Sequence, residues 1–524
     1  MWKFTKSQAR CIIKAIDRYI LKAEEDEEEE LREIGYLEAA ATVAIISSLE
    51  EQFAEAIENQ SKRFCSALSE FDNVEEFLNE GFEEFVQNDT IQEEIREILE
   101  ETSKDILGEF TTSYLNESGL ELAGYTDRTI GYVARWVEDT SEYFSENTVD
   151  QLRRILAEAI NEGKGVDKLA REIQAEGIRN TYHTARRVAQ TEVLRMHSYA
   201  AFEAMIQNPD LKTKSWVHTG AHKNRPRPNH VAMDGTTIPK MERFTLYGAD
   251  GCIYHPMFPR DSCLPASETV NCKCIIRRGR ASPVTFDTEE KKKKQQEAIE
   301  ADNKRWIEEQ GKEPETSTKG MLEWVKSLDK EQQQEYFGGG DAGLQRWALI
   351  ESGVIDTDDK FQVLYKTNEK GIRSRKSLKE LADDGIMTVP KKTLNHSALG
   401  DYKAASKKWP SGRLVSGGHS QAAIQQCDSL GVEYQITETL ANGVRIGNVP
   451  SSKSKMKRND NGQTWFPEDW NEDDILLAGI YVANTAPVTD NGYIQTGRYK
   501  GVVIRVLGDN NGPATIYPYF DQGE

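Results

Sequence analysis

The residues best suited to proton-transfer chemistry lie near the C-terminal end of the sequence, around His419. This histidine follows Gly417 and Gly418 in the segment SGGHS, residues 416–420. An imidazole titrates near neutral pH and can act as a general base or a general acid, and adjacent glycines let the backbone approach a phosphate closely. Negative charge that develops on such a phosphate must be offset by cations or hydroxyl donors at fixed positions. The candidate donors are Arg445, Lys453, Lys455, Lys457 and Arg458 among the cations, and Thr515 and Tyr517 among the hydroxyls.

Thr515 and Tyr517 are separated by one residue in a segment that reads as a β-strand. Alternate residues of a strand project from one face, so the two side chains should point the same way. Threonine can donate to a phosphate or a base edge, and tyrosine can donate to a phosphate or stack on a base. The alternative is that His419 is an ordinary turn residue, that the basic run is a solvated loop, and that Thr515 and Tyr517 are ordinary strand residues.

A second set of candidates is a cysteine cluster, since four of the seven cysteines fall within residues 252–274. Thiolates and imidazoles suit Zn²⁺, and a zinc ion that closes a small irregular domain would add folding free energy. The spacing departs from paired Cys–x–x–Cys knuckles, so buried free thiols and core histidines remain the alternative. We expect a structural site, because no nucleophile–base pair is legible here. The candidate ligands are Cys263, Cys272 and Cys274 with His230 or His255, and Cys252 is a further candidate thiolate.

The elements that must position these residues change character along the chain. The first part is helical, with apolar residues at three and four spacing and no proline before Pro209. The last part has Gly-Gly and Asn-Gly turns between short apolar runs, which predicts a strand meander. One helix signal interrupts it, where Asn471 is a good N-cap followed by three acids. We predict a multidomain protein with four parts: an acidic helical region (1–175), a small irregular α+β domain (176–282), a charged, solvated helical spacer with small helices (283–388) and an α+β domain (389–524).

Composition and charge exclude several classes of protein. Of the 524 residues, 38% are hydrophobic and 29% charged, and no apolar run is long enough for a membrane span. The N-terminal sequence also has no export signal that we recognise. The net charge of −21 is concentrated in residues 1–150, so nucleic acid should approach only the later parts. No P-loop, His–Glu–x–x–His helix or acidic metal triad is visible, which argues against an NTPase, a zinc protease and a two-metal DNA nuclease.

The middle part resembles the phage Mu F-like head-morphogenesis family of minor capsid proteins. The resemblance covers roughly residues 130–282 and is carried by ARRVAQTEVLRMHSYAAFEAM, Trp216, RPRPNHVAMDG and NCKC. It implies a protein of the inner phage head that joins the portal and is present in few copies. Portal and head proteins are the implied partners, and packaged DNA is a further candidate because residues 181–280 are basic.

The C-terminal part resembles bacterial EndoU-type ribonuclease toxins. The segments SGGHS, NGV, KSKMKR, TWFPEDWNEDDI, GRYKGVVIRV and TIYP occur in the family's order, roughly from Ser411 to Pro518. The resemblance implies a compact α+β fold and RNA cleavage, with two histidines and a lysine beside a Thr or Ser and a Tyr. His419, the basic residues and the absence of a carboxylate metal site predict that this cleavage requires no metal ion. No histidine follows His419, and His396 lies upstream of the matched segments. The second proton-transfer or charge-stabilising role should therefore fall to a basic residue such as Arg445, Lys455 or Lys457, although an arginine is a poor general acid.

Together these patterns predict a phage minor head protein fused to an EndoU-type endoribonuclease. The enzyme should cut RNA through the 2′-OH and leave a 2′,3′-cyclic phosphate, with His419, Arg445, Lys455, Lys457, Thr515 and Tyr517 as its site. We expect it in the virion near the portal and active in a bacterial cytoplasm, with an immunity protein as a further partner. The alternatives are a purely structural head protein with an inactive tail and a DNA-binding packaging factor.

Overall fold

The computed structural model describes residues 25–218, 226–278, 288–310, 316–369, 371–453, 462–489, 494–509 and 512–523. The chain forms two compact units. Unit 1 contains the residues up to 316 apart from 227–229 and 247–253, which group with the residues from Ser317 onward in unit 2. In the described part of the chain, no helix is both long and apolar enough to cross a membrane. The four-part division of the sequence stays a prediction.

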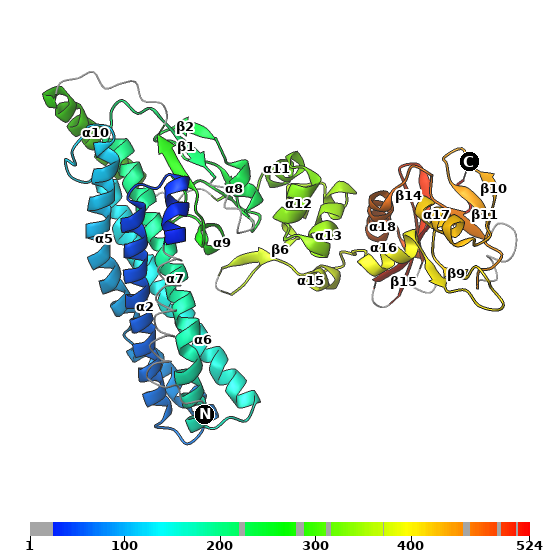
Figure 1. The fold of residues 1–524 in the computed structure, drawn as a ribbon, viewed down its shortest axis with the longest axis horizontal. Coiled ribbons are helices and arrows are strands. Elements are labelled where there is room, and N and C mark those ends of the chain that lie inside the picture. Colours follow the sequence, from blue (N-terminus) through cyan, green and yellow to red (C-terminus); the bar gives the residue numbers. More distant parts are fainter. Residues whose placement is uncertain are drawn as a thin grey trace. The chain divides into compact units, whose positions relative to one another are not determined.

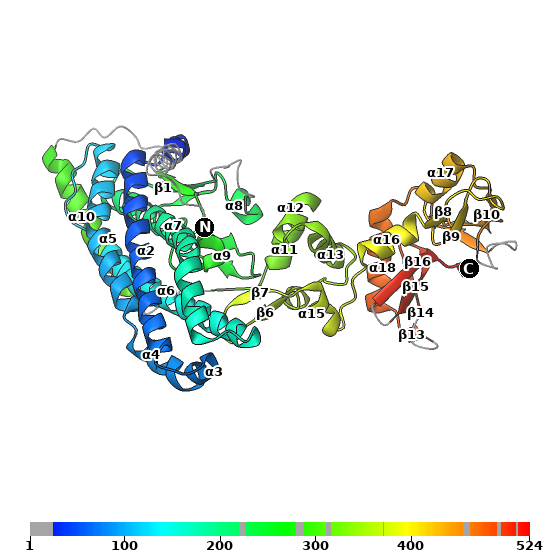
Figure 2. The same ribbon diagram turned by 60° about the horizontal axis from the view of Figure 1, so that its bottom comes forward.

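Unit 1 is dominated by long helices that lie side by side (Figures 1 and 2). Apolar residues such as Ile95, Leu99 and Phe110 are buried between them, as the helical spacing of the sequence predicts. Thr126 caps the third long helix by accepting a hydrogen bond from the Thr129 N–H. The expected helical N-terminal part is confirmed. The long helices are α2 (Ala39–Leu68), α5 (Ile91–Asn116), α6 (Asp127–Asn161) and α7 (Val166–Gln207).

Short elements follow the long helices or join them. Strand β1 is central in a three-stranded antiparallel sheet of order β2-β1-β5, in which Val217 pairs with Ile275. The helices are α3 (Val74–Glu76), the π-helical turn η1 (Phe77–Gly81), α4 (Phe82–Asn88), α8 (Pro228–Ala232), α9 (Ala266–Thr269) and α10 (Thr288–Glu309). The strands are β1 (Thr213–Val217), β2 (Thr237–Pro239), β3 (Leu246–Tyr247), β4 (Ile253–Tyr254) and β5 (Ile275–Arg278).

Helix α10 corrects our expectation of a solvated spacer after residue 282. Although its sequence is highly charged, the helix contains Ile299 and Trp306, which are both buried in unit 1. Buried Arg128 of α6 forms ion pairs with Asp302 at 3.1 Å and with Glu309 at 2.7 Å. Few apolar residues therefore suffice to dock this helix, because a buried arginine satisfies carboxylates on its inner face.

Unit 2 begins with small helices and a hairpin. The Asp329 carboxylate and the Gln332 side chain form a capping box at the start of α12. This region contains α11 (Met321–Ser327), α12 (Lys330–Tyr336), α13 (Gly340–Glu351), α14 (Asp358–Gln362), the hairpin β6 (Tyr365–Thr367) and β7 (Arg373–Arg375), and α15 (Leu378–Asp383).

The C-terminal part of unit 2 is α+β, as predicted. Asn471 caps α18 in a capping box with Asp474, which confirms the helix signal seen there. Helix α18 packs on one face of the sheet β13-β14-β15-β16, where Ile504, Val506 and Ile516 are buried. The helices are α16 (Lys391–Ala398), α17 (Gln421–Leu430) and α18 (Glu472–Thr485). The strands are β8 (Asp401–Lys403), β9 (Arg413–Ser416), β10 (Gln435–Thr439), β11 (Arg445–Asn448), β12 (Gln463–Trp465), β13 (Val488–Thr489), β14 (Ile494–Tyr499), β15 (Val502–Asp509) and β16 (Gly512–Pro518).

The sequence interpretation missed α16 and α17. Both have recognisable signals, since Ser420 caps α17 by accepting from the Ala423 N–H and Gly431 ends it at φ +66°. These two short helices matter because they flank the loop that carries His419.

Candidate functional sites

The loop between β9 and α17 holds His419 in a fixed position. Gly417 and Gly418 both have positive φ, at +67° and +72°. A Cβ on Gly417 would lie 1.9 Å from the carbonyl oxygen of His396, which no side chain could tolerate. The glycine pair thus allows the loop to pack closely against α16, while its predicted role in the approach to a phosphate stays a prediction.

The His419 imidazole is oriented by strand β12. Its Nδ1 lies 2.7 Å from the carbonyl oxygen of Thr464, and a carbonyl can only accept. Nδ1 therefore carries the proton of the neutral ring, which leaves the lone pair on Nε2. The Phe466 N–H also donates to the His419 carbonyl at 2.7 Å, and the Gln463 amide donates to the Gly418 carbonyl at 3.0 Å. This arrangement suits a general base that acts through Nε2.

Tyr517 lies beside His419. The two rings stack with their centroids 5.5 Å apart. Thr515 and Tyr517 lie on one face of β16, as predicted from their spacing. Tyr517 is opposite Arg505 of β15, which is opposite Thr496 of β14. This face of the sheet is the one that α18 does not cover.

Arg505 adds a cation to that face. Its Nε donates to the Thr496 hydroxyl at 3.2 Å, and its guanidinium carbon lies 3.5 Å from the Tyr519 ring centroid. These contacts hold the guanidinium over an aromatic ring, an arrangement compatible with nucleic-acid phosphates and bases. The sequence interpretation did not single out Arg505, although it lies in GRYKGVVIRV.

Arg445, a predicted site residue, lies beneath the His419 loop. Its side chain is buried, and its guanidinium donates to the Phe466 carbonyl at 2.7 Å and to the Gln421 side chain. Burial lowers the pKa of this arginine from its ordinary value. Its contacts suit a residue that positions β12 and α17. Lys455, Lys457 and Arg458 lie outside the described residues, while Lys453 is exposed at the end of the described segment.

His396 of α16 is a further histidine at this loop. The Gly418 N–H donates to the His396 carbonyl at 3.1 Å, and the next N–H, of His419, donates to the Ser397 carbonyl at 2.8 Å. The His396 Nδ1 lies 2.9 Å from an Asp401 carboxylate oxygen, which also accepts from the Ser416 hydroxyl at 3.0 Å. A carboxylate at Nδ1 accepts the proton of that nitrogen and so fixes the tautomer, with the lone pair of the neutral ring on Nε2. His396 therefore has the partners of a proton-transfer group.

The predicted metal ligands of unit 1 divide into two groups. His230, Cys272 and Cys274 are buried, and their ligand atoms lie within 4.8 Å of one another, so they could hold a metal ion. Cys263 and His255 are not members of this group, or of any other such group among the described residues. Burial raises the pKa of Cys263 far above its ordinary value, which suits an inert thiol.

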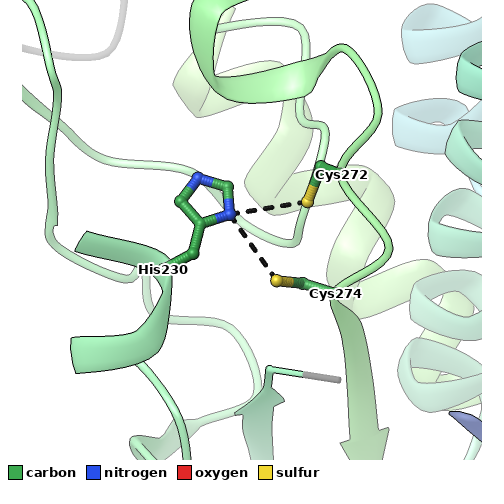
Figure 3. A group of neighbouring side chains, drawn as sticks. All are labelled: His230, Cys272 and Cys274. Atoms are coloured by element: carbon green, nitrogen blue, oxygen red, sulfur yellow. Dashed lines mark hydrogen bonds between the residues drawn. The ribbon is translucent and has the colours of Figure 1, made fainter. Parts of the chain in front are cut away.

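Figure 3 shows one imidazole nitrogen of His230 facing both sulfurs. This Nδ1 lies 3.5 Å from Cys272 Sγ and 3.5 Å from Cys274 Sγ. The other nitrogen, Nε2, lies 2.9 Å from a carboxylate oxygen of fully buried Glu268. A carboxylate that accepts from Nε2 orients the ring so that Nδ1 points toward the sulfurs, as in many metal sites.

The surroundings of the cluster favour the thiolate form of Cys272. The hydrogen bond from Cys274, together with His230 and Arg260, holds the pKa of Cys272 well below its ordinary value. Its thiol partner Cys274 has a pKa well above the ordinary value, because of that hydrogen bond and burial. Burial alone would lower the pKa of His230, but Cys272 and Glu268 outweigh it and raise the pKa to about 9. Buried Arg260 also donates to the carbonyls of Cys272 and Cys274, at 2.6 and 2.9 Å.

Comparisons with known families match these two regions. Residues 150–277 match the family described as Phage Mu protein F like protein, and residues 390–519 match the family described as Bacterial EndoU nuclease. The chain carries a Mu F-like domain and a bacterial EndoU nuclease domain. The EndoU match begins before Ser411, so our expectation that His396 lies outside it was wrong.

One curated relative is the protein named "Uncharacterized protein YqbB" of Bacillus subtilis (strain 168). It is 29% identical over 304 residues, which cover 55% of this chain and 97% of the relative. No solved structure matches the chain significantly. The Mu F-like domain contains the His230–Cys272–Cys274 group, and the EndoU domain contains both His396 and His419.

Proposed function

We propose that this protein is a minor phage head protein whose EndoU domain cleaves RNA. The observation that carries the enzymatic part is the orientation of His419, with Nδ1 held by the Thr464 carbonyl and the ring stacked on Tyr517. An inactive tail domain would have no need of a histidine fixed in one tautomer. A purely structural head protein is therefore the less favoured alternative.

In the proposed reaction, a base removes the proton of the 2′-OH, and the 2′ oxygen attacks the adjacent phosphorus. The bond from phosphorus to the 5′ oxygen breaks, and an acid protonates that oxygen. The products are a 2′,3′-cyclic phosphate and a 5′-hydroxyl, and no water or metal is consumed. His419 and His396 supply the base and the acid, since both are oriented through Nδ1 and His396 packs against the loop that carries His419.

The charge of the phosphorane is offset by donors on the open sheet face. Thr515 and Tyr517 are placed to donate to phosphate oxygens, and Lys455 or Lys457 completes the cationic part of the site. Arg445 supports the loop from beneath. Arg505, held over Tyr519, contacts the RNA beyond the cut position through a phosphate or a stacked base.

The Mu F-like domain supports a location in the virion with portal and other head proteins as partners, and the basic charge of residues 181–280 supports contact with packaged DNA. The RNA substrate is a host or competitor species met after delivery to a bacterial cytoplasm, where the domain acts as a toxin and an immunity protein could restrain it. In the Mu F-like domain, His230, Cys272 and Cys274 hold a structural zinc ion.

Sequencing of RNA ends tests the enzymatic proposal. Cells that express the full chain should accumulate RNA fragments with 2′,3′-cyclic phosphate ends, and cells that express the His419→Ala chain should not. Fragments with 3′-hydroxyl ends, or equal cleavage of DNA, would refute the proposed reaction. Equal fragment levels with and without His419 would refute the site.

A further inference from the structure

The metal group of unit 1 has a neighbour that the sequence interpretation did not consider, His218. This histidine directly follows β1, and its backbone N–H donates to the Asp234 carboxylate at 2.8 Å. Its ring Nδ1 lies 3.5 Å from Cys274 Sγ. The other ring nitrogen, Nε2, is buried and has no hydrogen-bond partner among the described residues.

The register of the sheet brings His218 to this place independently of side-chain details. Strand β1 pairs with β5 in antiparallel register, with Val217 opposite Ile275. The residue after Val217 and the residue before Ile275 are His218 and Cys274, so the ladder itself leads the two side chains toward each other. The backbone geometry and the side-chain distance therefore agree.

Three of the separations match a tetrahedral zinc centre. Zinc binds nitrogen at about 2.0–2.1 Å and sulfur at about 2.3 Å, and a tetrahedral angle then separates nitrogen and sulfur ligands by about 3.5 Å. The separations from His230 Nδ1 to Cys272 Sγ, from His230 Nδ1 to Cys274 Sγ and from His218 Nδ1 to Cys274 Sγ are all 3.5 Å. His218 itself lies outside the group whose ligand atoms are all within 4.8 Å of one another, so its ring would have to move closer to His230 and Cys272 when a metal binds.

Hydrogen bonds alone satisfy this cluster poorly. The Nδ1 of His230 can make one hydrogen bond, as donor or as acceptor, but faces two sulfurs, and the Cys274 thiol has one proton but faces two imidazole nitrogens. Buried polar groups that share donors in this way lose stability. A cation at the centre accepts a lone pair from every one of these atoms at once, so it resolves the conflict.

We infer that His218 is the fourth ligand of a closed Cys₂His₂ zinc centre, with His230, Cys272 and Cys274 as the others. This inference rests on the proposed zinc ion in the Mu F-like domain and deepens it by completing the ligand set. Four protein ligands leave no open position, so the centre is structural. It ties the end of β1, the helix 228–232 and the start of β5 together.

Cobalt substitution of the full-length protein tests this ligand set. We expect wild-type protein to contain about one Zn²⁺ per chain and, after exchange, to give tetrahedral Co²⁺ absorption with thiolate-to-cobalt charge transfer. His218→Ala should weaken metal affinity by roughly ten-fold or more and shift the Co²⁺ spectrum toward an open coordination sphere. His255→Ala, a histidine outside the metal group, is the matched control and should change neither quantity.

The outcomes separate the two levels of the proposal. Wild-type protein that binds no zinc would overturn the metal centre itself. Wild-type protein that binds zinc, with unchanged affinity and spectrum in His218→Ala, would overturn only the role of His218. His218→Cys guards against a folding defect in the alanine variant, because a third thiolate should retain the metal and strengthen the charge-transfer band. If His218→Cys retains the metal but its thiolate-to-cobalt charge-transfer band is no stronger than that of the wild type, His218 is not a ligand.

Discussion

The imidazole of His419 and the phenol ring of Tyr517 stack with their centroids 5.5 Å apart, although they come from a loop and from the last strand of the chain. Strand β12 explains the contact, because its Thr464 carbonyl orients His419 while the loop lies beside β16. The relationship joins a proton-transfer group to a phenolic donor. The nuclease predictions depend on it.

His419→Ala in the full chain should reduce RNA cleavage by about 10²–10⁴-fold, the usual weight of general acid–base catalysis. Initial rates on a short RNA measure the loss. The same RNA with 2′-deoxyribose at the cut position should resist the wild-type protein, because it lacks the attacking hydroxyl. His255→Ala, in unit 1, is the control for general effects of histidine removal. A rate within about two-fold of wild type for His419→Ala would contradict the assignment.

His396→Ala should reduce cleavage by a factor comparable to that of His419→Ala. The reason is that this histidine has a carboxylate at Nδ1 and flanks the same loop. Asp401→Asn should cost less, because it removes the carboxylate that orients the ring but leaves the imidazole itself in place.

If His396→Ala does not reduce cleavage, another residue must supply the second proton-transfer group. In that case Lys455→Ala or Lys457→Ala should show the large loss instead, and His396→Ala should leave both rate and pH profile unchanged. Arg445→Ala cannot distinguish these cases, because its buried contacts support the loop itself.

Tyr517→Phe should reduce the transition-state stabilisation by about 1–3 kcal/mol, since it removes one hydrogen-bond donor and keeps the ring stack. Thr515→Ala should have an effect of similar size. The matched control is Tyr481→Phe, which removes a hydroxyl from α18 on the other face of the sheet. An equal loss of kcat/KM in Tyr481→Phe and Tyr517→Phe would mean that the effect arises from stability rather than from the site.

The sequence predicted those elements that are stabilised by residues close together in the chain. Asn471 and the acids after it indicated α18 because a cap and a first turn are made by neighbouring residues. The glycine pair indicated the His419 loop for the same reason. His218, His396 and Arg505 were missed because their roles come from strand register and from helices that meet only in the folded chain. Helix α10 was misjudged because its anchors, Arg128 among them, lie on other helices.

Lys214 of β1 gives a prediction about stability and pH. Its ammonium group is buried between Phe202 and Phe244, at 4.7 and 5.3 Å from the ring centroids, and has no hydrogen-bond partner among the described residues. Burial lowers its pKa to about 7, with Arg243 and Arg128 adding to the shift and Asp261 and Glu242 opposing it. The folded state therefore binds this proton more weakly than the unfolded state does. The penalty is fully present below about pH 7 and fades as pH rises toward the unfolded value near 10.5.

Lys214→Met keeps the apolar stem and removes the charge, so it should raise the free energy of unfolding of unit 1. The gain should be larger at pH 6 than at pH 9, by about 3 kcal/mol, because a folded pKa that lies below the unfolded one penalises the protonated state. Denaturant titrations followed by far-ultraviolet circular dichroism, which reports mainly on the helices of unit 1, measure both gains. Lys212→Met, an exposed lysine two residues earlier, should change stability little at either pH. A gain for Lys214→Met that is the same at pH 6 and pH 9 would show that the amine stays protonated in the folded state up to pH 9, and would contradict a pKa lowered by burial.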